Sequence, residues 1–67
     1  MALQNLGARI KTARERRGLT QEALAKRTRL SRIYIAKLEG GDRQSPSLPV
    51  LDRIAKVLGV TIADLLK

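Results

Sequence analysis

The sequence predicts an all-α fold of five short helices in one compact domain over residues 1–67. Apolar residues recur at three- and four-residue spacings along five segments, which is the period of a helix with one buried side. Four of these segments follow a serine or threonine that suits a helix N-cap, and three precede a glycine that suits a helix end. Each segment therefore carries its own start or stop signal.

The first helix is expected to begin at Leu3 or Asn5 and to continue to Arg17. Gly18 is expected to end it in a left-handed conformation, which glycine adopts without steric cost. The side chains expected to face the core are Leu6, Ile10 and Ala13.

Residues 20–40 are the most informative segment and predict two helices joined by a tight turn. Thr20 suits the N-cap of a helix that ends near Thr28, and Ser31 suits the N-cap of a helix that stops at Gly40. Because only a few residues separate these helices, they must cross steeply. This is the layout of a helix-turn-helix.

The second of these helices presents a basic, polar side that suits DNA. Ile35 and Leu38 form its buried stripe, so the groups expected to face outward are Arg32, Ile33, Ala36 and Lys37. A guanidinium can donate two hydrogen bonds to guanine O6 and N7, and an apolar side chain can contact a thymine methyl. The pattern therefore indicates base reading in the major groove.

Two further helices are expected after a loop over residues 40–47. Helix four should begin at Ser47 or Leu48 and end at Gly59, with core side chains Leu51, Ile54, Ala55 and Leu58. Thr61 and Asp64, three residues apart, predict a capping-box start for the last short helix.

Composition excludes several classes of protein. The chain contains no cysteine and no histidine, so disulfides, zinc-finger ligands, thiol nucleophiles and histidine general bases are absent. We therefore expect no enzyme, no metal and no cofactor. No apolar run is long enough for a membrane span, and the N-terminus lacks a signal-peptide pattern, so we expect a cytoplasmic protein with no membrane association.

The positive charge is concentrated on the helix-turn-helix and the segments beside it. The formal net charge is +8, and residues 9–43 contain eleven Lys or Arg against four acidic residues, a net of +7. A phosphate backbone would bind such a surface through counterion release. A solvated basic surface without a partner is the alternative.

These residues resemble the phage repressor and Cro-like helix-turn-helix family, also called the xenobiotic response element family. The resemblance extends from Leu6 to Leu66, and it implies a lambda-repressor-like DNA-binding domain with the helix-turn-helix at helices two and three. Residues 30–39 are also similar to the recognition helix of restriction-modification controller proteins. One departure is Arg29, where the family usually has glycine. We expect a slightly different turn there, because a left-handed arginine would cost about 1 kcal/mol.

The resemblance and the residue chemistry together nominate a DNA site. The expected base contacts are Arg32, Ile33, Lys37 and Tyr34, and the expected phosphate contacts are Gln21, Arg43 and Arg17. Alternatives remain open: Arg32 and Lys37 could bind phosphate, Ile33 could cover the turn, and Tyr34 could only pack. Glu39 is expected to have a structural role, paired with Arg14 or Arg9.

The last helix is the expected dimer contact, through Ile62, Leu65 and Leu66. In the family this region commonly joins two copies, which would set the recognition helices about 34 to 36 Å apart, one turn of B-DNA. The alternative is that Ile62 and Leu65 complete the core of the monomer.

The expected function is sequence-specific transcription regulation, with repression favoured, by a bacterial or phage homodimer on a near-palindromic DNA operator. No small-molecule ligand is expected. The rival interpretations are a DNA-binding antitoxin and a protein-interaction adaptor.

Overall fold

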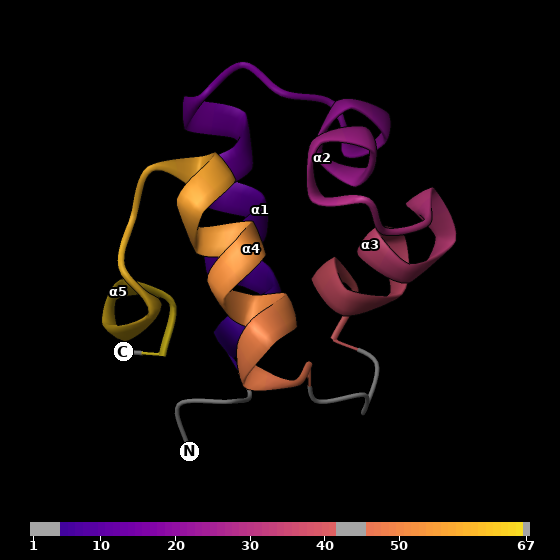
Figure 1. Cartoon of the computed structure of the whole chain (residues 1–67). Coiled ribbons are helices and arrows are strands. Elements are labelled where there is room, and N and C mark those ends of the chain that lie inside the picture. Colours follow the sequence, from indigo (N-terminus) through magenta and orange to yellow (C-terminus); the bar gives the residue numbers. More distant parts are fainter. Residues whose placement is uncertain (1–4, 42–45, 67) are drawn as a thin grey trace.

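The computed structural model describes residues 5–41 and 46–66, and over these ranges the chain is helical without any strand. The five helices are α1 (Leu6–Arg16), α2 (Gln21–Thr28), α3 (Arg32–Glu39), α4 (Leu48–Leu58) and α5 (Ile62–Leu66) (Figure 1). The predicted all-α class and the five helices are confirmed.

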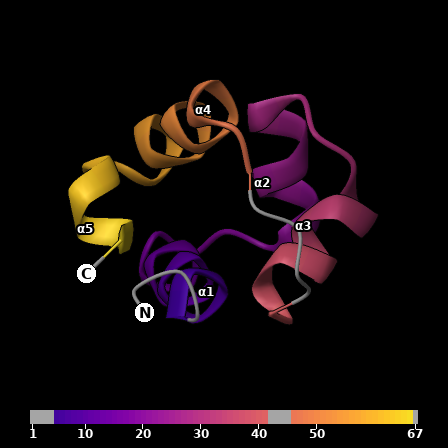
Figure 2. The ribbon, with the colours of Figure 1, turned by 90° about the horizontal axis from the view of Figure 1, so that it is seen from below.

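The helices surround one core. Seen from below, α1 and α4 lie on opposite sides of it, α5 closes one end, and α2 with α3 closes the other (Figure 2). The helices α5 and α3 are therefore on opposite sides of the core, a placement that both views show (Figures 1 and 2).

Side-chain caps begin four of the helices as the sequence predicts. The hydroxyls of Thr20 and Ser31 each accept a backbone hydrogen bond at 3.0 Å, and that of Ser47 accepts one at 3.4 Å. At α5 the capping box is reciprocal: the Thr61 N–H donates to Asp64 Oδ2 at 3.1 Å, and the Asp64 N–H donates to Thr61 Oγ1 at 3.0 Å.

The limits of α1 differ slightly from the prediction. The helix begins at Leu6, one residue after Asn5, and the alternative start at Leu3 lies outside the described residues. It ends at Arg16 instead of Arg17, and Gly18 follows with φ +70°. The left-handed conformation predicted for Gly18 is confirmed.

The expectation for the turn between α2 and α3 is wrong, because Arg29 is left-handed, with φ 61° and ψ 35°. The Leu30 N–H donates to the Ala25 carbonyl at 2.9 Å, five residues back. The same hydrogen bond follows Gly18 and Gly59: the Leu19 N–H donates to the Arg14 carbonyl at 3.1 Å, and the Val60 N–H donates to the Ala55 carbonyl at 3.0 Å. This hydrogen bond defines a helix end that requires one left-handed residue, whatever its side chain. The turn therefore has the left-handed conformation for which the resembled family usually has glycine, and in this chain Arg29 bears the strain.

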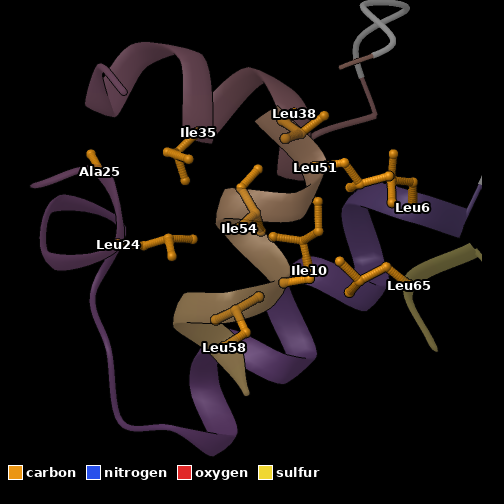
Figure 3. Close-up of a cluster of buried hydrophobic side chains, with 11 residues drawn as sticks. Leu6, Ile10, Leu24, Ala25, Ile35, Leu38, Leu51, Ile54, Leu58 and Leu65 are labelled. Carbon is orange, nitrogen blue, oxygen red and sulfur yellow. The ribbon is translucent and has the colours of Figure 1, made fainter. Parts of the chain in front are cut away.

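The core draws on every helix (Figure 3). Its fully enclosed members include Ile10, Leu24, Ile35 and Ile54, each with no exposed area. The predicted core residues of α1 and α4 are buried, except that Ala13 is half-buried at the margin. Thr28 is also buried, and its hydroxyl is satisfied there by donating to the Leu24 carbonyl at 2.7 Å.

A buried ion pair joins α1 to the end of α3. Arg14 donates from Nε to Glu39 Oε2 at 2.6 Å and from Nη2 to Oε1 at 3.0 Å, and their side chains are 10% and 3% exposed. The Arg14 Nη1 also donates to the Leu19 carbonyl at 2.7 Å, in the segment before α2. Of the two partners expected for Glu39, Arg14 is confirmed. The pair ties three segments of the chain together.

The contact between α1 and α3 also depends on Gly7. A β-carbon at this position would lie 2.2 Å from the Leu38 carbonyl oxygen and 2.9 Å from that of Glu39. Because both obstacles are backbone atoms, any larger residue would push α3 away from α1. Gly7 therefore sets how closely the recognition helix approaches the core.

Replacing Arg29 with glycine is expected to stabilise the domain by about 0.5 to 1 kcal/mol. The gain is the relief of left-handed strain, reduced by the greater freedom of glycine in the unfolded chain. Gly18→Ala is the matched opposite change: its β-carbon would meet nothing within 4 Å, so the backbone strain alone should destabilise by about 1 kcal/mol. Urea denaturation of both variants measures the two shifts, and an unchanged Arg29→Gly variant would contradict the assignment of strain.

Arg14→Met is expected to destabilise the domain by about 3 kcal/mol, because it leaves the Glu39 carboxylate buried without its cation. Glu39→Leu should cost a similar amount. The double variant should be more stable than either single variant, since it leaves no buried charge. Additive losses in the double variant, measured by the same denaturation, would show that the pair is not coupled.

Candidate nucleic-acid interface

The outward side of α3 is the centre of the candidate interface. Arg32, Ile33 and Lys37 are all exposed, and Ile33 is 64% exposed, which is unusual for a large aliphatic residue. Ile35 and Leu38 are buried on the opposite side. The structure thus brings together two cations and one apolar group on a single helix face, as the sequence predicts, while Ala36 is half-buried beside them.

Tyr34 lies at the edge of this face. It is half-buried and packs against the core cluster, which favours the packing alternative for its ring. Its position in the first turn of α3, two residues after Arg32, still places it beside the exposed surface.

Gln21 occupies the first position of α2, and its side chain is already engaged. The amide Nε2 donates to Glu39 Oε1 at 3.1 Å, which links the start of α2 to the end of α3. The first backbone N–H groups of a helix have no partner within the helix. The geometry therefore supports a phosphate contact through the backbone N–H of Gln21 more directly than one through its amide.

Arg17 is not brought to the α3 surface. Its guanidinium lies against the end of α4, where Nη1 is 3.0 Å from the position that a β-carbon of Gly59 would take. It lines a hollow with residues of α1 and α5, and no residue of α3 takes part in that lining. The phosphate contact of Arg17 stays a prediction. Arg43, the other loop candidate, lies outside the described residues.

The dimer contact predicted for Leu65 requires correction. Leu65 is 2% exposed and belongs to the core of its own chain, so its side chain cannot form a surface contact. Ile62 and Leu66 are half-buried at the margin of the same cluster. Of the three predicted residues, only these two retain exposed area.

The charges around α3 are mainly positive. Exposed cations on α2 are Lys26 and Arg27, followed by Arg29 in the turn, and the nearby exposed carboxylate is Glu22. Glu39 does not offset them, because it is enclosed and paired with Arg14. Its hydrogen bond raises the pKa of the Arg14 guanidinium, against a smaller lowering by burial. The pair therefore stays ionised and presents little net charge to the surface.

Two residues that support the position of α3 are not predicted from the sequence. Gly7 permits the close approach of α1 to α3. Thr28 is buried at the end of α2, where its hydroxyl donates to the carbonyls of Leu24 and Ala25. A glycine inside an otherwise helical pattern was the available signal for Gly7. Within residues 5–41 and 46–66, no cluster of acidic side chains could hold a metal ion, and no helix is long and apolar enough to cross a membrane.

Comparison with known proteins agrees with this geometry. A family model described as a helix-turn-helix domain matches residues 5–66. The immunity repressor protein of Bacillus phage phi105 is 45% identical over 58 residues, which are 87% of this chain and 40% of that protein. The chain thus spans less than half the length of this curated relative.

Solved structures share the fold closely. SinR, described as the master regulator for biofilm formation and solved in complex with DNA, matches with a TM-score of 0.88 at 29% identity over 92% of this chain and 98% of that chain. The restriction-modification controller protein C.AhdI from Aeromonas hydrophila matches with a TM-score of 0.85 at 33% identity over 94% of each chain.

The fold also occurs within a larger enzyme. Hydroxypropylphosphonic acid epoxidase from S. wedmorenis matches 97% of this chain with a TM-score of 0.88, but the match covers only 34% of that chain. The relatives matched in sequence, by contrast, include transcription regulators and a phage repressor. The chain belongs to the phage repressor-like, xenobiotic response element type of helix-turn-helix domain.

Proposed function

We propose that this protein is a sequence-specific repressor of transcription that binds a near-palindromic DNA operator as a homodimer and is not an enzyme. The observation that carries the proposal is the exposed face of α3, where Arg32, Ile33 and Lys37 are held outward by a helix whose other side is buried. Such a face has the width and the donors to read base edges in the major groove. We expect it to work in the cytoplasm and to lie on the nucleoid when it is bound to DNA.

Phosphate contacts would fix the position of α3 in the groove. The start of α2 offers the backbone N–H of Gln21, and the exposed cations of α2 and α3 supply positive potential around it. The predicted contact of Arg43 would add to them from the loop after α3. Base reading by Arg32 and Lys37 would then set the sequence preference.

Selection of bound duplexes from a random DNA pool at about 150 mM salt tests the whole proposal. We expect an enriched site with twofold symmetry, whose halves are separated by about one turn of B-DNA. An enriched site without symmetry would remove the homodimer. Salt-dependent binding without enrichment would remove sequence-specific repression and leave the adaptor or antitoxin interpretation.

Arg32→Ala is expected to weaken binding to the selected site by about 1 to 3 kcal/mol and to relax discrimination at one base pair. The loss of a two-hydrogen-bond contact to guanine is the reason. Arg16→Ala removes the same charge from an exposed position on α1 and should leave the base preference unchanged. Equal weakening on all sequences, measured by fluorescence anisotropy, would reassign Arg32 to a phosphate contact.

Leu66→Glu is expected to shift the protein from dimer to monomer without unfolding it, because Leu66 is only half-buried. Binding to the full palindrome should weaken more than binding to one half-site. Leu65→Ala provides the contrast: this side chain is 2% exposed, so the variant should lose about 2 to 5 kcal/mol of stability. Sedimentation equilibrium that shows an unchanged dimer for Leu66→Glu would exclude α5 as the dimer contact.

A further inference from the structure

A hollow between α1 and α5 has no part in the proposed DNA contacts. Its volume is about 600 Å³, within the range of binding pockets. Small and apolar side chains contribute to its lining, namely Ala8, Ala13, Leu58, Val60 and Leu65. Three arginines line it as well, Arg9, Arg16 and Arg17. It thus combines an apolar surface with a concentration of positive charge.

Among the described residues that line the hollow, positive side chains outnumber carboxylates. Asp64 is the carboxylate that lines it, and its Oδ2 already accepts the Thr61 N–H at 3.1 Å as part of the α5 cap. Three cations against one carboxylate favour an anionic occupant.

The spacing of the cations favours an extended occupant. Arg9 and Arg16 are seven residues apart on α1, so they lie near the same side of the helix and about 10 Å apart along it. A peptide with several carboxylates can give each arginine a partner of its own, and its aliphatic side chains would suit the apolar part of the lining.

The position of the hollow makes it compatible with DNA binding. Its lining includes no residue of α2 or α3. The helix α5, which contributes to the lining, lies across the core from α3 (Figure 2). A DNA duplex carries its apolar groups inside its grooves, which α3 is proposed to read, so a duplex bound to α3 leaves the hollow free.

We propose that the hollow between α1 and α5 docks an acidic peptide segment of a partner protein. Carboxylates of the segment pair with Arg9, Arg16 and Arg17, and an aliphatic side chain rests on Ala8, Ala13 and Val60, the apolar lining residues that keep exposed area. The partner can then be recruited while α3 remains on its operator. This assignment does not depend on the sequence preference of α3.

The test is binding of a fluorescein-labelled peptide of about 12 residues, composed of glutamate and leucine and about 18 Å long as a helix. Anisotropy at about 150 mM salt compares two triple variants that remove the same charge. Arg9→Gln/Arg16→Gln/Arg17→Gln should weaken binding at least about tenfold. Lys26→Gln/Arg27→Gln/Arg29→Gln, on the α2 side, should change it by less than about twofold.

Thr12→Glu is a second variant that tests the same site without removing any cation. Thr12 is exposed and lines the hollow, so a glutamate there would pair with the arginines of the same chain. It should weaken binding of the peptide about tenfold as well. Circular dichroism checks that each variant remains folded. The peptide should shift amide NMR signals of α1 and α5 and should not be displaced by an excess of operator duplex.

Three results would overturn the proposal. Equal weakening in both triple variants would mean unspecific attraction to a basic protein. Displacement of the peptide by duplex, with NMR shifts on α3, would mean that the peptide only imitates the phosphate backbone. Shifts of Ala8, Arg9 and Thr12 on α1 that depend on protein concentration without peptide would assign the hollow to a second copy of the chain.

Discussion

The buried pair of Arg14 and Glu39 is the interaction on which the recognition surface depends. The carboxylate is enclosed at the end of α3, and it accepts hydrogen bonds from α1 through Arg14 and from the start of α2 through Gln21. Arg14 also holds the Leu19 carbonyl between α1 and α2. A buried charge is costly unless its partners are complete, so the pair selects one arrangement of the three helices.

Packing in this small domain leaves little freedom around that pair. The helices α1 and α3 approach so closely that Gly7 has no room for a β-carbon, and α2 closes on α3 through a turn that forces Arg29 into a strained conformation. In both cases the packing of the helices determines the local backbone, even where a residue is strained by it. The result is a short α3 that is held rigidly while its solvent side remains free to bind.

The two sides of the molecule have different chemistry. The side of α2 and α3 carries cations on a convex helix face, which suits the grooves and phosphates of a duplex. The side of α1 and α5 carries arginines around an apolar hollow, which suits a peptide. Because no residue of α2 or α3 lines the hollow, the two surfaces do not overlap.

The sequence by itself determined the helices, their caps and most of the core, because hydroxyl caps, terminal glycines and apolar spacing act over a few residues. It also determined the exposed face of α3, since burial of Ile35 and Leu38 leaves only one side for Arg32 and Lys37. Tertiary structure decided what depends on distant segments. It buried Leu65 within its own chain, moved Arg17 to the α5 side, chose Arg14 over Arg9 for Glu39 and kept Arg29 left-handed. Those outcomes follow from long-range packing and backbone closure, for which local residue patterns carry no signal.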